Sequence, residues 1–97
     1  MMSDKHLMQF LRQYKNSHKE EYSLSRLGVF GSVARKDDAS DSDLDIVVEF
    51  VKPNLFIQSQ IREDLQDALK REIDVIALSD HMNPKLLKRI EQDVIYV

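Results

Sequence analysis

The sequence predicts one small domain of the α/β (α+β) class, with residues 1–97 as a single unit. The chain has 97 residues, of which 42% are hydrophobic, and this is enough for one core but not for two. Apolar residues recur with a helical period in three segments, and the shorter apolar or alternating runs between these segments are typical of strands. Glycine, proline and asparagine stand where the segments meet, as turn and cap residues do.

The N-terminal segment predicts a helix over residues 4–16, which Ser3 can cap. Its apolar residues are spaced i, i+3, i+4 and i+7 and therefore share one face: Leu7, Phe10, Leu11 and Tyr14. The polar run 16–21 ends this pattern. Residues 24–30 then have the aliphatic and aromatic character of a short strand, which Gly31 ends.

The next segment predicts a short helix over 32–36, a polar loop to Ser42, and a strand over residues 43–51. Because side chains alternate along a strand, one face of this strand is apolar throughout. That face consists of Leu44, Ile46, Val48 and Phe50. The other face begins with Asp43 and Asp45 and is therefore acidic at its start.

Pro53 and Asn54 open a second long helix, which we expect to end near Arg71. Residues 73–78 follow as a strand that the sequence predicts to be buried, although it contains the carboxylate of Asp74. The two acidic strands are thus separated by one helix.

The C-terminal segment predicts a helix with Asn83 as its cap and Pro84 at its first position, followed by a short strand over residues 94–97. The apolar stripe of this helix is Leu86, Leu87 and Ile90. Its basic residues are Lys85, Lys88 and Arg89, and a solvated helix face explains them better than a nucleic-acid patch does.

Composition excludes several classes of function. The chain has no cysteine, which rules out disulfides, a thiolate nucleophile and cysteine-based zinc sites. The net charge of -3 argues against sequence-independent binding to nucleic-acid phosphates. No apolar run approaches the roughly 20 residues that span a bilayer, and no signal segment precedes the domain, so we expect a soluble cytoplasmic protein with no membrane contact.

Three carboxylates are the candidate catalytic residues and metal ligands. Asp43 and Asp45 are two residues apart on a strand, so their side chains project from the same face and can converge on one or two cations. Asp74 can join them if its strand lies beside theirs. Magnesium, with its preference for oxygen ligands, fits such a site when a substrate adds phosphates. For Asp74 the structural alternative is a pair with Arg71 or with a loop donor.

A turn between a strand and a helix provides the candidate nucleotide-binding residues. At Gly31 and Ser32 free backbone N–H groups and the helix dipole favour phosphate oxygens. Arg35, one turn later, can reach a phosphate or neutralise the acidic segment. Taken alone, the Gly-Ser pair is also compatible with an ordinary helix cap, and Arg35 with a surface salt bridge.

Taken together, Gly31-Ser32-x-x-Arg35, then Ser42-Asp43-x-Asp45 opening an apolar strand, then Asp74 in a later strand, resemble the minimal nucleotidyltransferase (MNT) family of the DNA polymerase beta superfamily. The resemblance spans about residues 24–97 and extends to the closing Asn83-Pro84 helix and its short tail. Lys36 departs from the pattern, because many relatives carry glycine there.

The resemblance implies a polymerase beta-like nucleotidyltransferase fold: a small mixed sheet with helices packed on it. It also implies transfer of AMP from ATP to a hydroxyl group. On this basis Asp43 and Asp45 hold two Mg²⁺ ions, Asp74 assists as a ligand and in deprotonation, and Gly31 and Ser32 hold the leaving phosphates. Short members of the family resemble antitoxins, which implies a HEPN ribonuclease toxin as partner and one of its tyrosines as acceptor.

Two other functions stay open at the level of the sequence. The first is a binding protein that keeps the fold but neutralises its partner by binding alone, without catalysis. Transfer to a small molecule, as in aminoglycoside-modifying enzymes, would need a second domain to hold that substrate, and the 97 residues leave no room for one. The presence of all three acids favours an active enzyme.

Overall fold

The computed structural model describes residues 4–31, 44–52 and 54–97. The elements follow in the order α1 (Asp4–His18), β1 (Leu24–Phe30), β2 (Leu44–Phe50), α2 (Leu55–Leu69), β3 (Ile73–Ala77), α3 (Pro84–Asp93) and β4 (Ile95–Tyr96). The predicted combination of helices and strands is confirmed. The predicted helix over 32–36 and the loop to Ser42 lie outside the described residues. No helix in the described part is long and apolar enough to cross a membrane.

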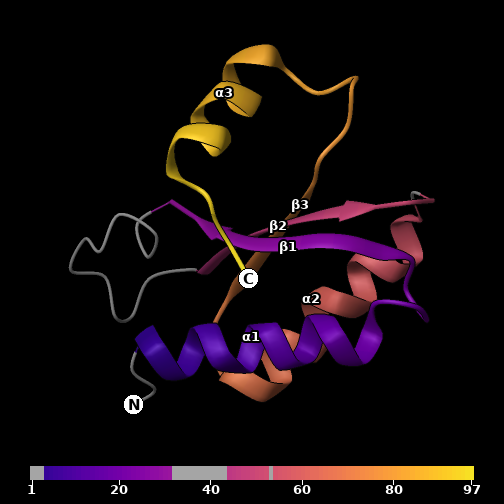
Figure 1. The fold of residues 1–97 in the computed structure, drawn as a ribbon, viewed down its shortest axis with the longest axis vertical. Helices are drawn as coiled ribbons and strands as arrows, with labels where there is room; N and C mark the ends of the chain where they lie inside the picture. Colours follow the sequence, from indigo (N-terminus) through magenta and orange to yellow (C-terminus); the bar gives the residue numbers. More distant parts are fainter. Residues whose placement is uncertain (1–3, 32–43, 53) are drawn as a thin grey trace.

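The four strands form one mixed sheet in the order β3-β2-β1-β4. β1 pairs antiparallel with β2 and with β4, whereas β2 and β3 are parallel. The parallel pair follows from the connection, because α2 carries the chain back along the sheet before β3 begins. Figure 1 shows α1 and α2 on one side of the sheet and α3 on the other.

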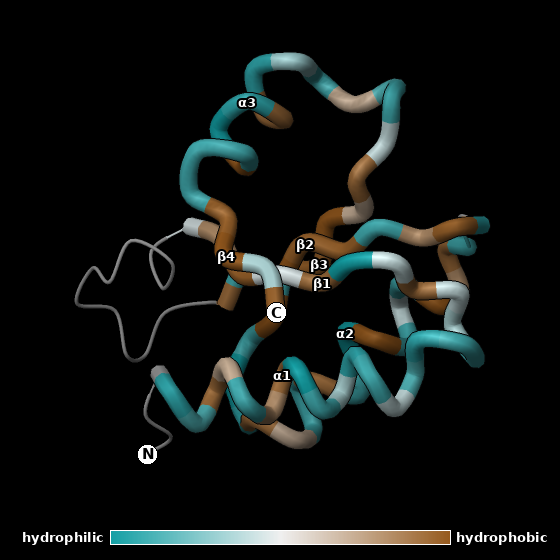
Figure 2. The backbone as a smooth tube through the Cα atoms, in the orientation of Figure 1, coloured by the Kyte–Doolittle hydropathy of each residue, from teal (hydrophilic) through white to brown (hydrophobic). Residues whose placement is uncertain are grey.

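The main core lies between the sheet and the pair α1 and α2. It contains the apolar face predicted for β2, together with Leu7, Leu11 and Tyr14 of α1 and Ile61 and Leu65 of α2. β1 and β3 contribute Leu27, Val29 and Ile73. Figure 2 shows β2 and β3 as mainly hydrophobic segments in the middle of the fold, between these helices and α3.

The opposite face of the sheet carries acidic as well as apolar side chains. Alternation along the strands places Phe30 of β1, Asp45 and Glu49 of β2, and Asp74 of β3 on this face. α3 lies over it, and Ile90 is its one fully buried residue among those described. The helix therefore contacts the sheet through a narrow apolar stripe and leaves space on both sides.

Asn54 and Asn83 cap the helices that follow them. The Asn83 cap was predicted, whereas Ser3, the predicted cap of the first helix, lies outside the described residues. The Asn54 side chain accepts hydrogen bonds from the backbone N–H groups of Phe56 and Ile57, at 2.9 and 3.3 Å. The Asn83 side chain accepts one from Lys85 at 2.8 Å. Since a capping side chain replaces the missing intrahelical partner of these N–H groups, each asparagine defines where its helix begins.

Helix α1 is two residues longer than predicted. It continues to His18, although the sequence turns polar at Asn16. The His18 ring stacks between Tyr14 and Tyr22, with centroids 4.3 and 4.9 Å away, and its Nδ1 lies 2.9 Å from the backbone oxygen of Tyr14. These contacts stabilise a last turn that the hydrophobic pattern alone does not predict.

Strand β3 is less buried than predicted. It ends at Ala77 rather than Leu78, and only Ile73 is fully buried, because β3 is at the edge of the sheet. Two side chains of α2 bind its outer carbonyl groups: Gln58 Nε2 donates to Val75 O at 2.9 Å, and Arg62 Nε donates to Ile73 O at 3.1 Å. α2 thereby satisfies acceptors that an edge strand leaves unpaired.

The other boundaries differ slightly from the predictions. β2 is described from Leu44 to Phe50, so Val51 lies outside the strand, and Asp43 lies outside the described residues. The last strand is limited to Ile95–Tyr96. In α3 only Ile90 of the predicted stripe is fully buried, and Leu86 and Leu87 each line a pocket.

A polar cluster joins α1 to α2 around Asp64. Its Oδ2 accepts hydrogen bonds from the hydroxyl groups of Tyr14 at 2.7 Å and Tyr22 at 3.2 Å, and Gln60 donates to Oδ1 at 2.8 Å. Burial raises the pKa of Asp64, but these hydrogen bonds outweigh it and hold the pKa below its usual value. Burial, followed by the contact with Asp64, raises the pKa of Tyr14 well above its usual value.

We expect Tyr14→Phe to lower the free energy of unfolding by about 1 kcal/mol at pH 7, the usual net contribution of one hydrogen bond. Above pH 10 the unfolded chain loses the Tyr14 proton while the folded chain retains it, so wild-type stability falls as the pH rises. Tyr14→Phe removes part of this fall. Urea unfolding at several pH values measures both effects, with Tyr96→Phe as the control. If the free energies of unfolding of the wild type and of Tyr14→Phe fell equally with pH above pH 10, this account would be contradicted.

Candidate active site

Asp45 and Asp74 are partners in the parallel register of β2 and β3. Neighbouring strands lie about 4.8 Å apart, and register partners project their side chains from the same face of the sheet. The two carboxylates, 29 positions apart in the sequence, are therefore adjacent on the face below α3. Asp45 is partly exposed and Asp74 is exposed, so ligands in solution can reach both.

The strands also place Gly31 against Asp45. Phe30, the last residue of β1, pairs with Asp45 across the antiparallel ladder, and Gly31 follows it. Gly31 has φ 78°, a left-handed conformation that favours glycine. A Cβ atom at this position would overlap the Asp45 carboxylate. Glycine therefore both allows the turn at the end of β1 and lets the backbone approach the acid.

A pocket of about 280 Å³ opens between this turn and α3. Phe30, Gly31 and Asp45 form its sheet side. The helix side consists of Leu86, Arg89, Ile90 and Asp93. Leu86 and Ile90 of the apolar stripe predicted for α3 thus lie over the candidate site. The position of the stripe over the site was not predicted, because a hydrophobic stripe indicates which side of a helix is buried but not which surface covers it.

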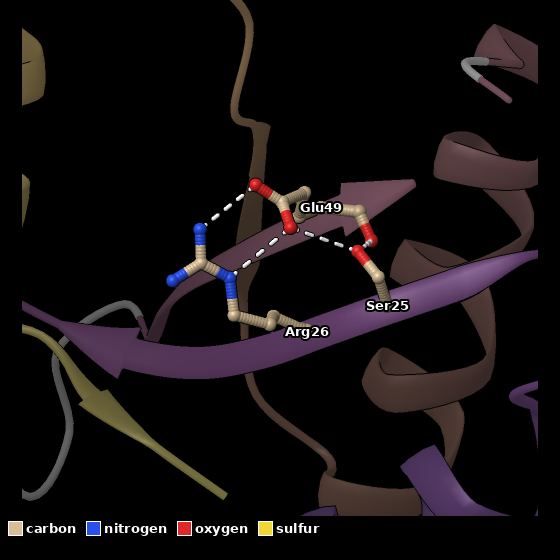
Figure 3. Close-up of polar contacts among 3 residues, drawn as sticks. All are labelled: Ser25, Arg26 and Glu49. Atoms are coloured by element: carbon tan, nitrogen blue, oxygen red, sulfur yellow. Dashed lines mark hydrogen bonds and ion pairs between the residues drawn. The ribbon is translucent and has the colours of Figure 1, made fainter. Parts of the chain in front are cut away.

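A second acidic residue on the same face of β2 has a different environment. Glu49 lies opposite Arg26 in the antiparallel ladder and pairs with it through Nη2 at 2.8 Å and Nε at 3.1 Å, while Ser25 Oγ donates to Glu49 at 2.9 Å (Figure 3). The hydrogen bond from Arg26, followed by that from Ser25, lowers the pKa of Glu49. Arg26 also lies over the Tyr96 ring, 4.8 Å from its centroid.

The two acidic residues of β2 therefore have different neighbours on the adjacent strands. Glu49 faces a cation across the ladder, whereas Asp45 faces another carboxylate, Asp74. Like charges directly opposite one another destabilise a sheet. Among the described residues no ion pair or hydrogen bond engages the Asp74 carboxylate, which gives no support there to a structural pair with Arg71. This acidic end is the part of the face suited to a cationic ligand.

For three of the residues proposed from the sequence the structure gives no position. Ser32, Arg35 and Asp43 lie outside the described residues. Of the six, the structure brings together Gly31, Asp45 and Asp74. No group of three metal-ligating side chains occurs within the described ranges.

The described residues nevertheless fit a magnesium site in their chemistry. Asp45 and Asp74 supply carboxylate oxygens from adjacent strands, and Mg²⁺ is commonly bound by one or two protein carboxylates together with substrate phosphates and water. The Gly31 turn lies against Asp45 and lines the same pocket. Such a site needs no third protein ligand from the described part of the chain.

Sequence comparison assigns the chain to a family. Residues 12–97 match the family described as Polymerase beta, Nucleotidyltransferase, and the chain belongs to this family. It is 33% identical to a Methanocaldococcus jannaschii protein that is named, provisionally, a protein adenylyltransferase, with 94% of each chain covered. It is also 29% identical to the protein adenylyltransferase MntA of Thermococcus cleftensis, over 100% of this chain and 98% of that protein.

Solved structures agree with the fold. A structure provisionally described as a minimal nucleotidyltransferase superposes with a TM-score of 0.77 at 27% identity, covering 97% of this chain and 95% of the other. A complex of a tri-AMPylated Shewanella oneidensis HEPN toxin with an MNT antitoxin matches at TM-score 0.65 and 16% identity, over 92% and 70%. A toxin-antitoxin complex with AMP-PNP matches at TM-score 0.70 and 17% identity, over 87% and 69%. The nucleotidyltransferase fold expected from the sequence is thus confirmed.

Proposed function

We propose that this nucleotidyltransferase transfers AMP from ATP to a hydroxyl group of a partner protein. The observation that carries the proposal is the register pair of Asp45 and Asp74 beside the Gly31 turn. Asp45 and the close backbone turn at Gly31 line one pocket, and Asp74 lies beside Asp45 on the adjacent strand. This arrangement suits a metal-bound nucleoside triphosphate. The names of the related adenylyltransferases support AMP as the transferred group.

The reaction is a substitution at the α-phosphorus of ATP. The oxygen of the acceptor hydroxyl forms a bond to the α-phosphorus, and the bond between that phosphorus and the oxygen leading to the β-phosphate breaks. Pyrophosphate leaves, and the hydroxyl proton passes to a base, for which we propose Asp74. The exposed position of Asp74 at the edge of the sheet allows a large acceptor to approach it.

Each site residue has a distinct role in this proposal. Asp43, Asp45 and Asp74 hold Mg²⁺, which supplies charge stabilisation as the bond to pyrophosphate breaks. Gly31 and Ser32 bind the β- and γ-phosphates through backbone N–H groups and the serine hydroxyl. Arg35 adds a cation to the same phosphates. Positioning the two reactants in one pocket supplies much of the remaining rate enhancement.

For the partner we propose a HEPN-type toxin, with this chain as its antitoxin in the cytoplasm. The support is the fold shared with the MNT antitoxin that was solved with its AMPylated HEPN toxin. The open side of the site at β3 also suits a macromolecular acceptor better than a small one. The net charge of -3 gives no basis for direct binding to nucleic acid.

The test is the mass of the partner after reaction. A HEPN-type protein from the same organism, incubated with this chain, Mg²⁺ and each of the four ribonucleoside triphosphates, should gain the mass of AMP with ATP alone. Gain of the mass of a different nucleotide would mean that ATP is not the substrate. An unmodified partner would contradict the proposal. If an Asp45→Asn variant still neutralises the partner in cells, neutralisation by binding alone is the better account.

A further inference from the structure

The helix side of the candidate site contains a cationic residue that the proposed function does not use. α3 lies over the acidic face, and its one fully buried residue among those described is Ile90. Arg89, the residue before it, is exposed overall but lines the pocket that also contains Gly31 and Asp45. An arginine next to a buried residue on an amphipathic helix can extend its guanidinium along the sheet face.

Charge distinguishes Arg89 from the other residues of this pocket. It is the one cationic side chain among the described residues that line the cavity, and Asp45 and Asp93 contribute acidic groups. No ion pair or hydrogen bond holds the Arg89 guanidinium within the described part of the chain. Arg26, the arginine paired on the same sheet face, is bound to Glu49 instead.

The proposed function places a polyanion in this pocket. A nucleoside triphosphate brings several negative charges next to Asp45, and their repulsion must be offset by cations. Guanidinium groups bind phosphate oxygens in bidentate geometry, so arginine is well suited to bind the phosphates of a nucleotide. The pocket volume of about 280 Å³ lies at the low end for small-molecule sites, so it accommodates part of a nucleotide rather than all of it.

We propose that α3 completes the nucleotide site, with Arg89 as a ligand of the triphosphate chain across the pocket from Gly31. This inference rests on the proposed function and adds to it a phosphate-binding residue from the last helix. The predicted solvated face is confirmed, since Lys85, Lys88 and Arg89 are all exposed, and the inference adds a ligand role for Arg89 alone. Lys85 and Lys88 remain solvated, because neither lines the pocket.

The test compares Arg89→Ala, Arg89→Lys and the matched control Lys88→Ala by calorimetric titration with ATP, AMP and inorganic pyrophosphate in the presence of Mg²⁺. Loss of one charge-assisted hydrogen bond predicts about tenfold or greater weakening of ATP and pyrophosphate binding by Arg89→Ala. AMP, which lacks the β- and γ-phosphates, should lose less than about twofold. Arg89→Lys should recover part of the affinity, and Lys88→Ala should bind as the wild type does.

The three ligands separate phosphate binding from a structural role. Arg89 is exposed, so we expect its alanine variant to retain the wild-type unfolding temperature. Unchanged ATP affinity, an equal loss for ATP and AMP, or an equal loss in Lys88→Ala would each overturn the proposal. A wild-type chain that binds ATP in an Arg89-dependent manner but modifies no protein would contradict the proposed function while supporting this inference.

Discussion

We expect Asp45→Asn to reduce AMP transfer at least about 1000-fold while the fold persists. Removing a ligand that positions charge at the α-phosphate costs several kcal/mol of transition-state stabilisation, and each 1.4 kcal/mol is about tenfold in rate. Asparagine keeps the size of the side chain beside Gly31, so packing at the turn is preserved. It also removes one of two like charges in register, which relieves repulsion with Asp74.

The matched control is Glu49→Gln. Glu49 is a carboxylate on the same strand and the same face, but it pairs with Arg26 and lies away from the pocket. Single-turnover transfer with labelled ATP should fall in Asp45→Asn and stay within about twofold of wild type in Glu49→Gln, because an exposed ion pair contributes little to stability. Equal loss in both variants would mean that the sheet face, not the acidic pair, is required.

The second large effect is expected at Gly31, where Gly31→Ala should reduce both stability and transfer. The left-handed φ of 78° costs a residue with a Cβ atom about 1–2 kcal/mol, and the new methyl group overlaps the Asp45 carboxylate. Together these effects predict a loss of about 2–4 kcal/mol in the free energy of unfolding. A carboxylate displaced by about 1 Å should lower transfer by roughly 100-fold.

A double-mutant cycle separates the two causes. In an Asp45→Ala background the overlapping carboxylate is gone, so Gly31→Ala should cost only the backbone contribution of about 1–2 kcal/mol. Urea unfolding of the four proteins measures the coupling. If Gly31→Ala destabilises both backgrounds equally, Gly31 and Asp45 do not contact each other as described.

Local chemistry explains why several elements could be predicted from the sequence alone. The aliphatic run Leu24–Phe30 is bounded by polar residues and glycine and coincides with β1. Asn83 and Pro84 specify the start of α3 because a side-chain cap and a fixed φ act within one turn. By contrast, the end of α1 depends on the stacking of His18 between two tyrosines, and Tyr22 comes from beyond the helix.

The site was predictable to a smaller extent. The spacing of acids along one strand indicates a shared face. The pairing of Asp45 with Asp74, however, depends on the order of the strands, which the hydrophobic periodicity of the sequence does not indicate. The exposure of β3 depends on its edge position for the same reason. The contribution of Arg89 depends on which face α3 covers. The roles of all six site residues stay predictions, and for Ser32, Arg35 and Asp43 the position does so too, because they lie outside the described residues.

The central claim is that the carboxylates of adjacent strands hold a divalent cation together with the nucleotide phosphates. A crystal structure of this chain with Mn²⁺ and AMP-PNP tests it most directly, because anomalous scattering locates Mn²⁺ in place of Mg²⁺. The account predicts an anomalous peak between Asp45 and Asp74, in contact with phosphate oxygens beside Gly31. A nucleotide bound elsewhere, or Mn²⁺ with no contact to either carboxylate, would contradict it.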